Sequence, residues 1–360
     1  MGLNSMDFSP EHLKRYLTHK LGSPVEIRNV ERFSRGTSRQ TWFVDIERSG
    51  KDPETLVFRT DLAAGSIEPS SLAQEYFMYE RLGHTDVPVA KALWWDEDPE
   101  WTGTPLYVRE KVEGSWNIPN FLDPDPQYDE LRIEISKEHM RKLALVHKVD
   151  WRVLNFGEWL PVPKDEADCG RLYVQTAMRQ FEEVRGQGMP VMLEAAEWLI
   201  DHAPVAPCLS LCKGTNGFGE EVWRGRELVA LSDWEEASIG DPAADFAFMQ
   251  YLAPELERDG KKIWGMEHAI DYYRDVSGIP VTIEAVRYYG VIRAVRLIIM
   301  AEKAGQAVHD QPLLAEIRQA WTGTEVGHVC RQGLLAAMGL ADAPPASVLA
   351  EFHESIEAPL

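Results

Sequence analysis

The chain has 360 residues, 44% of them hydrophobic, and a formal net charge of −21 at pH 7. This length suggests one large or two moderate domains, and this apolar content is enough for a core. The negative charge argues against unspecific binding to nucleic acid or to an anionic membrane. The four cysteines lack the spacing of metal-binding pairs and fit a reducing cytoplasm. No leader-like start and no apolar run of roughly 18 residues is found, so we expect a cytoplasmic protein without a membrane span.

The first part of the chain has the pattern of a small sheet with helices. Ser9-Pro10 predicts a capped helix over residues 12–21. A second helix is predicted over residues 70–82, where apolar residues share one face. Strands are predicted for residues 25–32, 40–47 and 56–59. The segment Ser34-Arg35-Gly36-Thr37-Ser38 between the first two strands is a weak phosphate-loop signal, and an ordinary hairpin explains it as well.

Beyond Gly114 the pattern becomes mainly helical. A loop rich in Pro, Asp and Asn is predicted from residue 117 to 127. Helical periodicity then predicts helices over residues 135–149, 171–185, 191–202, 262–275, 283–304 and 312–330. His147 lies near the end of the first of these, where we interpret it as a packing or capping residue.

Four acidic residues gather in the segment from residue 209 to 248. Two short apolar runs, 209–212 and 228–232, each end in polar groups, and the second is followed by Asp233-Trp234-Glu235, Gly240-Asp241-Pro242 and Asp245. Strand-like runs that end in carboxylates can place metal ligands at the edge of a core. The alternative is a pair of strands whose acids face water, but four acids at fixed offsets beside a Gly-Asp-Pro turn make this less attractive.

This D-x-E…G-D-P…D segment resembles that of the aminoglycoside phosphotransferase and choline kinase group. The resemblance extends over roughly residues 25–335 and implies an α+β, two-lobed protein-kinase-like fold. Residues 1–112 would form a small antiparallel-sheet lobe that binds the nucleotide. Residues 113–360 would form a mainly helical lobe that carries the metal and catalytic segment 209–248. In this group the first Asp binds the magnesium ions that hold ATP, so the resemblance assigns that role to Asp233 and implies ATP and Mg²⁺.

The resemblance also gives meaning to the first lobe. Kinases align the ATP phosphates with a basic residue on the third strand, held by a Glu of the next helix. Arg59 and Glu75 occupy these places, although a surface ion pair is the alternative. Backbone groups at Glu110 and Val112 would face the adenine in a hinge that begins at Tyr107. Ser34, Gly36 and Thr37 would be the phosphate loop.

The second signature of the group, H-G-D-x-x-x-x-N, is altered in this chain. Without gaps it aligns with Lys213-Gly214-Thr215, four further residues and Glu220. Thr215 then stands at the position of the base Asp, where its hydroxyl cannot act as a base at neutral pH. Lys213 could pair with a phosphate or an anionic acceptor. Glu220 would share the metal with Asp233, or else turn outward to Arg224 or Arg226.

Three functions are compatible with this pattern, and Lys213, Thr215 and Asp233 are the candidate catalytic residues. The first is an ATP- and magnesium-dependent phosphotransferase that acts on a small hydroxylated molecule. The second is a nucleotide-binding protein without transfer activity. The third is a kinase-like enzyme of different chemistry, such as nucleotidyl transfer or ligation. We expect a small-molecule substrate in each enzymatic case, and the altered loop leaves the choice open.

Overall fold

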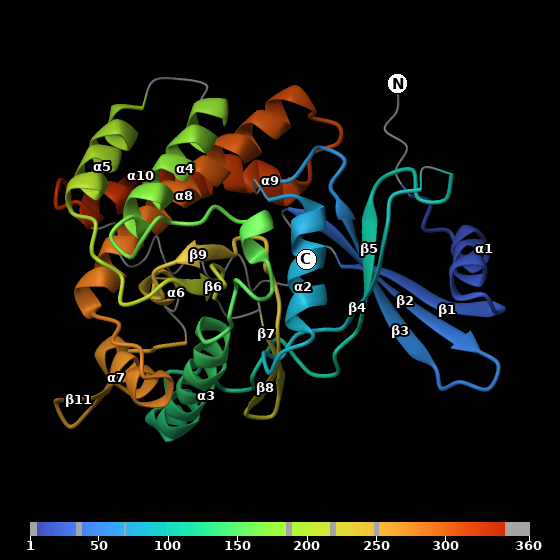
Figure 1. Ribbon diagram of the computed structural model, residues 1–360, viewed down its shortest axis with the longest axis horizontal. Helices are drawn as coiled ribbons and strands as arrows, with labels where there is room; N and C mark the ends of the chain where they lie inside the picture. Colours follow the sequence, from blue (N-terminus) through green and yellow to red (C-terminus); the bar gives the residue numbers. More distant parts are fainter. Residues whose placement is uncertain are drawn as a thin grey trace.

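The computed structural model describes residues 6–33, 38–67, 70–98, 100–184, 189–216, 221–247 and 252–342, without the side chain of Glu325. Figure 1 shows a five-stranded sheet with α1 on its outer side and a larger, mainly helical part beyond α2. This is the α+β arrangement that the sequence predicts. Among the described helices, none is long and apolar enough to cross a membrane.

The sheet is antiparallel, with strand order β1-β2-β3-β5-β4. The two long strands predicted on either side of residues 34–37 are confirmed, and each end lies within one residue of its predicted position. Its strands are β1 (Val25–Phe33), β2 (Arg39–Arg48), β3 (Glu54–Asp61), β4 (Ala92–Asp96) and β5 (Leu106–Glu110).

Each face of the sheet is covered by one helix. On one face, α1 (Pro10–Leu21) packs Leu13 and Leu17 against a separate apolar cluster that includes Leu106 and Val108 of β5. The intervening Tyr107 points the other way and joins the main core with residues of α2 (Leu72–Leu82). This alternation along β5 is the period of two that a strand imposes on its side chains. It turns the polar end of Tyr107 toward α2, where the candidate site begins.

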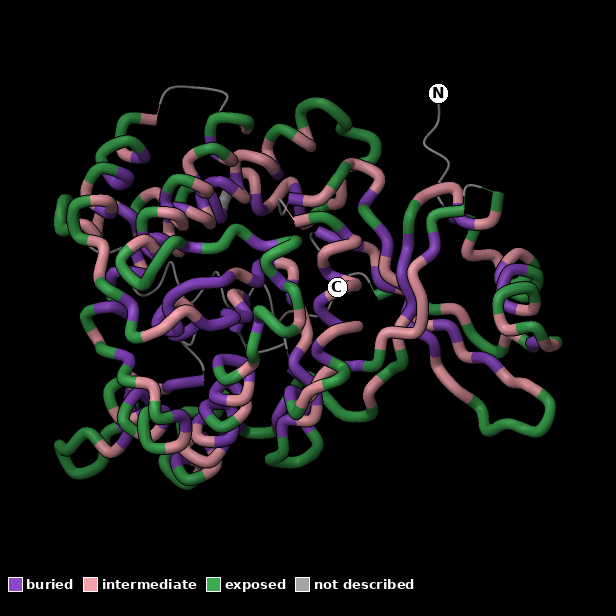
Figure 2. The backbone as a smooth tube through the Cα atoms, viewed as in Figure 1, coloured by how far each residue is buried: buried purple, intermediate pink, exposed green. Residues whose placement is uncertain are grey.

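The second part of the structure is built around one large hydrophobic core, whose buried residues are purple in Figure 2. Its long helix α8 starts at Thr282, whose side chain accepts a backbone N–H, as Ser9 does at the start of α1 in the first part. The helices are α3 (Asp129–His147), α4 (Cys169–Val184), α5 (Pro190–Asp201), α6 (Ala243–Phe246), α7 (Met266–Ser277), α8 (Ile283–Asp310), α9 (Ile317–Trp321) and α10 (Gly327–Ala337), with short helical turns at Pro126–Tyr128, Phe156–Glu158 and Thr322–Val326.

Among the described residues, three two-stranded ladders complete this part. They pair β6 (Ser210–Cys212) with β9 (Ser238–Gly240), β7 (Glu221–Arg224) with β8 (Glu227–Leu231), and β10 (Leu256–Arg258) with β11 (Lys261–Trp264). The two apolar runs of the acidic segment, in β6 and β8, are therefore strands, but each pairs with a different partner. The helix predicted from Lys262 is wrong at its start, because β11 occupies those residues and α7 begins only at Met266.

Candidate functional site

The first component of the site is a buried ion pair between β3 and α2. Arg59 Nη2 donates to Glu75 Oε1 at 2.9 Å, and the Tyr107 hydroxyl donates to the same oxygen at 2.9 Å. The Glu75 side chain is 1% exposed, so the alternative of a surface ion pair is wrong. A carboxylate buried this deeply is tolerated only because these donors compensate its desolvation.

A second arginine, which no sequence motif indicates, lies against the same carboxylate. Arg39 Nε is 3.7 Å from Glu75 Oε2, and Arg39 also donates to Asp61 Oδ1 at 2.6 Å and to the Ser70 carbonyl at 2.5 Å. Arg39 thus joins the start of β2 to the end of β3 and to the segment before α2. No local pattern around residue 39 points to this role, since Glu75 is far away in the sequence.

Two carboxylates of the second lobe approach Arg59. Burial alone would lower the pKa of the Arg59 guanidinium, but the negative charge of Glu75 raises it well above its usual value, with smaller contributions from Glu235 and Asp233. Direct hydrogen bonds link the same carboxylate segment to the first lobe, from Ser38 to Glu235 and from the Asp233 N–H to the Tyr79 hydroxyl on α2. Groups from β3, α2 and the segment after β8 therefore lie in one region, and the roles that the resemblance gives Arg59, Glu75 and Asp233 remain predictions.

Asp233 has the geometry of a ligand-binding residue. It follows β8 in the left-handed backbone region, with φ 63°, and its N–H donates to the Tyr79 hydroxyl at 3.2 Å. A non-glycine residue with this φ carries a small conformational cost, and such residues gather at functional sites. Asp233 Oδ1 is buried and finds no hydrogen-bond partner among the described residues. A buried carboxylate oxygen without a donor fits a magnesium ligand, because Mg²⁺ prefers hard oxygen atoms.

Glu235 connects the two lobes directly. Both of its carboxylate oxygens lie 2.7 Å from Ser38 Oγ, at the start of the first lobe's second strand. In the sequence, Glu235 stands out only as part of a motif. Ser34, Gly36 and Thr37, the predicted phosphate loop, lie outside the described residues, as does the predicted metal ligand Glu220. Their assignments therefore remain predictions.

The altered loop is fixed by Asp245 through its backbone. Asp245 Oδ2 accepts the Lys213 N–H at 2.8 Å, and Oδ1 accepts the Gly214 N–H at 2.7 Å. Burial raises the pKa of Asp245, but the hydrogen bond from His147 and the two backbone N–H groups lower it below the usual value. Gly214 has φ 89° and lies so close to Glu236 that an added Cβ would be 2.4 Å from its carbonyl oxygen. The glycine is therefore required by the close approach.

The side chains of the predicted catalytic loop are turned inward. Lys213 is fully buried, and its Nζ donates to the carbonyl of Thr215, which is itself 9% exposed. Lys213 and Thr215 thus lie next to one another. The neighbouring Asn216 was not predicted, yet it is buried and its Oδ1 has no hydrogen-bond partner in the described part of the chain.

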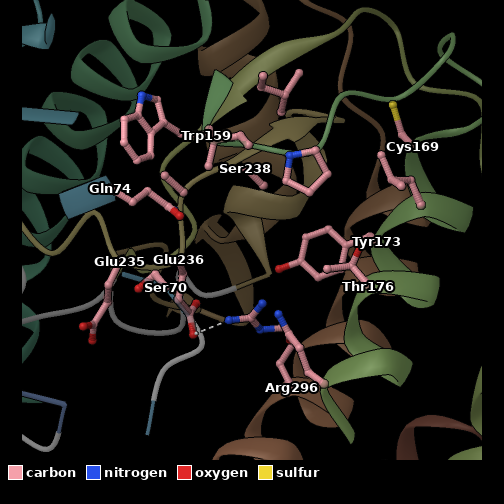
Figure 3. Close-up of a pocket in the computed structure, with 16 residues that line it drawn as sticks. Ser70, Gln74, Trp159, Cys169, Tyr173, Thr176, Glu235, Glu236, Ser238 and Arg296 are labelled. Atoms are coloured by element: carbon pink, nitrogen blue, oxygen red, sulfur yellow. Dashed lines mark ion pairs between the residues drawn. The ribbon is translucent and has the colours of Figure 1, made fainter. Parts of the chain in front are cut away.

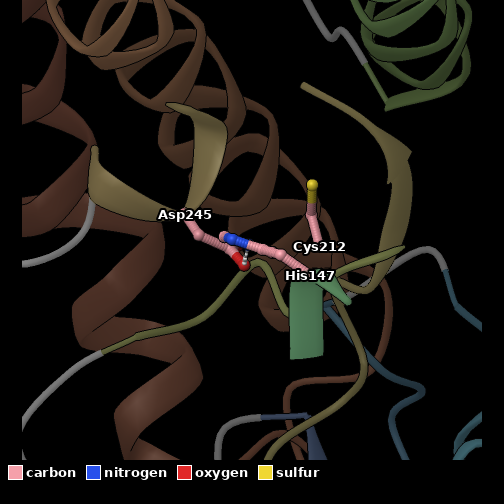
Figure 4. A group of neighbouring side chains, drawn as sticks. All are labelled: His147, Cys212 and Asp245. Atoms are coloured by element: carbon pink, nitrogen blue, oxygen red, sulfur yellow. Dashed lines mark hydrogen bonds and ion pairs between the residues drawn. The ribbon is translucent and has the colours of Figure 1, made fainter. Parts of the chain in front are cut away.

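His147, Cys212 and Asp245 form a buried cluster that resembles a metal site (Figure 4), with ligand atoms within 4.8 Å of one another. Their bonding argues against an ion. His147 Nε2 pairs with Asp245 Oδ2 at 2.9 Å, and Nδ1 pairs with the Tyr273 hydroxyl at 2.5 Å. Burial raises the pKa of the Cys212 thiol well above its usual value, which keeps it protonated. We interpret the cluster as the support of the loop, in which His147 is held by hydrogen bonds to Asp245 and Tyr273.

The predicted hinge lies at the end of β5. The Glu110 N–H donates to the Lys91 carbonyl at 3.0 Å, and the Lys111 N–H donates to the Thr55 carbonyl at 3.3 Å. These two amides are thus engaged within the sheet. Val112 follows them, at the point where the chain leaves the sheet. The partly buried Val112 side chain packs against the main core. Adenine contacts at Glu110 and Val112 remain a prediction.

Solved structures share this fold over almost the whole chain. A Ralstonia eutropha protein, provisionally assigned as an aminoglycoside phosphotransferase, superimposes with a TM-score of 0.65 and 21% identity, covering 92% of this chain and 99% of its own. A macrolide 2′-phosphotransferase from Brachybacterium faecium gives 0.54 and 18% identity, covering 87% and 98%. The aminoglycoside phosphotransferase APH(4)-Ia, bound to AMP-PNP and hygromycin B, gives 0.53 and 14% identity, covering 86% and 97%. The two-lobed kinase-like fold is confirmed.

Curated relatives are long proteins that this chain matches only in part. Acyl-CoA dehydrogenase family member 10 of Mus musculus is 26% identical over 262 residues, which are 69% of this chain and 23% of the relative. Family member 11 of Homo sapiens is 24% identical over 311 residues, 81% of this chain and 36% of the relative. The chain therefore spans about a quarter to a third of their length. The profile of the phosphotransferase enzyme family matches residues 29–273, more than half of the sequence, and the chain belongs to this family.

Proposed function

We propose that this protein is an ATP- and magnesium-dependent phosphotransferase that acts on a small hydroxylated molecule. The observation that carries the proposal is the convergence on α2 of Arg59, held by buried Glu75, and of Asp233, whose N–H donates to Tyr79 and whose Oδ1 has no partner among the described residues. Phosphoryl transfer depends mostly on positioning and on neutralising charge, and these groups supply both. The AMP-PNP bound to one structural neighbour supports ATP as the donor.

Each group has a distinct role in this proposal. Arg59 holds phosphate oxygens, and Glu75 fixes the direction of its guanidinium. Asp233 would hold magnesium, with Glu220 as the predicted second ligand, and the ion would neutralise phosphate charge. Glu235 is bonded to Ser38 and keeps the edge of the first lobe over the cluster. The Asp245 carboxylate holds the loop at Lys213 and Gly214 in place.

A second candidate is nucleotide binding without transfer. It is favoured by the loop itself, since residues 213–216 carry no carboxylate and Lys213 donates to the Thr215 carbonyl. General-base assistance is worth about 10²–10⁴-fold in rate. A chain without it would bind nucleotide and turn it over slowly or not at all.

Binding is tested by thermal unfolding with and without magnesium-ATP. A ligand that binds only the folded chain raises the melting temperature with concentration. We expect a rise with magnesium-ATP that Asp233→Asn removes and Arg59→Ala weakens. An unchanged melting temperature at millimolar nucleotide, with and without magnesium, would refute the proposed function.

Product analysis separates the candidates. Incubation with ATP and a set of hydroxylated compounds should release ADP and a phosphorylated acceptor. AMP release would instead indicate nucleotidyl transfer or ligation, and intact ATP beside a clear thermal shift would indicate binding alone. GTP in a parallel series gives the nucleotide preference, which is of interest because another neighbour was solved with GDP.

A further inference from the structure

One face of α2 reaches the candidate site at two points. Glu75 and Tyr79 are four residues apart on this helix, so they lie on the same side of it, one turn from each other. Glu75 is bonded to Arg59 of β3 in the first lobe. Tyr79 is bonded to the backbone of Asp233 in the second lobe. Gln74 lies about 100° around the helix from Glu75 and lines a cavity of about 160 Å³ instead (Figure 3).

The Tyr79 ring is held from several sides. Its side chain is 1% exposed and belongs to the main hydrophobic core. The ring centre of Tyr107 lies 6.1 Å from that of Tyr79, and the Arg109 guanidinium lies 5.3 Å from it. A guanidinium over an aromatic face is attracted to the ring. The hydroxyl oxygen at the end of this packed ring is therefore a fixed hydrogen-bond acceptor, and its position follows that of α2.

Asp233 depends on this acceptor for its backbone conformation. β8 ends at Leu231, and Asp233 adopts a φ of 63°, in a left-handed region that residues with a side chain rarely occupy. Its N–H donates to the Tyr79 hydroxyl at 3.2 Å. Without that oxygen a part-buried N–H would have no acceptor, which is costly. The hydroxyl therefore favours the left-handed conformation over its alternatives.

The backbone in turn decides where the Asp233 carboxylate points. Asp233 Oδ1 is buried and has no hydrogen-bond partner among the described residues, so no donor in that part of the chain holds this atom. A carboxylate oxygen without a donor suits a magnesium ion. The direction in which this oxygen is offered comes from the conformation of residue 233, and hence from the bond to α2.

We propose that Tyr79 is a positioning residue for Asp233, whose carboxylate it aims at the magnesium ion by accepting the Asp233 N–H. This inference rests on the proposed function and deepens it, because it names a residue outside the motifs that sets the metal site. Groups that hydrogen-bond a metal ligand typically change the metal affinity by about 10- to 100-fold when they are removed.

α2 then orients both halves of the site through different side chains. Glu75 fixes the cation that holds phosphate oxygens, and Tyr79 fixes the carboxylate that holds the metal. The Tyr107 hydroxyl donates to Glu75 Oε1 at 2.9 Å and so supports the first half. Because each half has its own tyrosine hydroxyl, removing one or the other should give different defects.

Tyr79→Phe removes the hydroxyl and keeps the ring. The full chain is titrated with ATP and followed by thermal unfolding, once with excess magnesium and once with EDTA. The ratio of the two dissociation constants is the enhancement of ATP binding by magnesium. We expect the variant to lose about 10-fold or more of this enhancement, through weaker binding of magnesium-ATP alone. Binding in EDTA, which depends on Arg59 and Glu75, should stay close to wild type.

A second readout covers the case in which the wild-type chain binds ATP too weakly in EDTA for a dissociation constant. The free magnesium concentration that gives half of the thermal shift at saturating ATP then replaces the ratio. Tyr79→Phe should raise this concentration by the same factor, about 10-fold or more.

Two further tyrosines are the controls. Tyr107→Phe should weaken ATP binding by similar factors with and without magnesium, which leaves the enhancement unchanged. Tyr16→Phe also removes a buried hydroxyl, one that is bonded to Asp96 in the first lobe, and should change neither dissociation constant.

Amide hydrogen exchange reports on the bond itself without ATP. In the unmodified chain, exchange at the Asp233 amide, followed by NMR, should be slow. Tyr79→Phe should accelerate it more than at Leu231, whose N–H is bonded to the Pro88 carbonyl at 2.8 Å. Exchange of the Asp233 amide in the unmodified chain at the rate of an unstructured amide would overturn the proposal, even where the variant fails to fold.

The binding series can also overturn it. An unchanged enhancement in a folded Tyr79→Phe variant would mean that the hydroxyl does not aim the carboxylate. Equal weakening of ATP binding with and without magnesium would mean that Tyr79 only supports the fold of α2.

The failure of this inference is distinct from the failure of the proposed function. If magnesium-ATP shifts the melting temperature of the wild-type chain and the enhancement does not depend on the Tyr79 hydroxyl, the positioning role alone is wrong. If magnesium-ATP gives no shift with the wild-type chain, the proposed function is wrong, and the role of Tyr79 at a metal ligand is wrong with it.

Discussion

At the scale of single residues, the loop that carries Lys213 and Thr215 depends on the glycine between them. Gly214 has φ 89°, and a Cβ added there would lie 2.4 Å from a backbone oxygen of Glu236. Gly214→Ala must therefore strain its own backbone and displace that of its neighbour. We predict that it lowers the free energy of unfolding by about 2–3 kcal/mol, measured by urea denaturation.

Gly225 supplies the control for this prediction. It also has a positive φ, 63°, but nothing lies within 4 Å of its added Cβ. Gly225→Ala should cost only the conformational term, about 1 kcal/mol. Equal losses for the two variants would show that the close approach at residue 214 contributes nothing.

A pH dependence is predicted from Asp241, in the Gly-Asp-Pro turn. Burial raises its pKa to about 6, from 3.8 for an exposed carboxyl group, while the Ala243 N–H on Oδ1 partly opposes this. Because the folded-state pKa is the higher one, this group favours the folded chain most when it is protonated. Its contribution is therefore lost as the pH rises from about 4 to 6, by up to about 3 kcal/mol.

The comparison with Asp241→Asn checks this sign. The side chain at position 241 cannot ionise in this variant. Its free energy of unfolding relative to that of wild type should therefore increase between about pH 4 and pH 7, as measured by urea denaturation at each pH. A wild type that gains stability relative to the variant over this range would contradict the raised pKa.

The residues of the site differ in how far the sequence could predict them. Arg59, Glu75 and Asp233 follow from motifs at defined offsets on a strand, a helix and a strand end, and the structure brings them together. Arg39 and Glu235 act through partners distant in the sequence, Glu75 and Ser38. Contacts of this kind arise from tertiary packing, which no local pattern records.

At the scale of secondary-structure elements, many boundaries follow local rules, but the single helix predicted over residues 312–330 is wrong at both ends, because α9 begins only at Ile317 and α10 continues to Ala337. The failure at Lys262 has a signal in the sequence. The β10–β11 hairpin turns at Asp259-Gly260, both with positive φ, 52° and 71°. Asp-Gly between short strands is among the strongest hairpin signals in a sequence. The predicted helix extends back to Lys262 because helical periodicity in the following residues continues into this short segment. The turn, and not the periodicity, decides the structure there.

Arg39 holds three elements together, and its removal should therefore affect the whole first lobe. The side chain is 1% exposed and joins β2 to Asp61 of β3 and to the carboxylate of Glu75 on α2. Breaking a buried charge pair is costly because it leaves the partner charge without compensation. We predict that Arg39→Ala lowers the free energy of unfolding by about 2–4 kcal/mol in urea denaturation.

Arg28 of the neighbouring strand is the control. It pairs with Glu47 at 2.6 Å, but both side chains are well exposed. Such pairs are screened by solvent and contribute little. Arg28→Ala should leave the unfolding curve close to wild type, and a loss equal to that of Arg39→Ala would show that burial of the pair is unimportant.

At the scale of the whole molecule, contacts between segments far apart in the sequence tie the two lobes together. The Leu231 N–H of β8 donates to the Pro88 carbonyl of the first lobe at 2.8 Å. In addition, α9 and the residue before it reach the first lobe: Glu316 pairs with Arg32 at 2.5 Å, and Gln319 donates to the Gly65 carbonyl at 3.0 Å. Figure 1 shows α9 beside the upper end of α2. The lobes are thus restrained in their relative motion by a segment from late in the sequence.

Gln319 is the buried residue in the contact between α9 and the first lobe, and its side chain makes two hydrogen bonds. Its Nε2 holds Gly65, and its Oε1 accepts the Glu316 N–H at 3.0 Å to complete a capping box. Gln319→Ala removes both bonds, so we predict a loss of about 1–2 kcal/mol in the free energy of unfolding. We also predict faster amide hydrogen exchange over residues 62–67, whose turn loses its support, while the amides of β2 keep their protection because their ladder is untouched.

Exposed Gln332 of α10 provides the comparison, since its contact is with His328 of the same helix, at 3.3 Å. Gln332→Ala should leave exchange in the first lobe unchanged. If Gln319→Ala destabilised α9 without altering exchange over residues 62–67, its bond to Gly65 would be incidental, and the lobes would be held by other contacts, such as Leu231 on Pro88 and Ser38 on Glu235. If exchange rises at residues 62–67 alone, α9 acts as a restraint on the edge of the nucleotide lobe, and magnesium-ATP should bind more weakly to this variant than to Gln332→Ala.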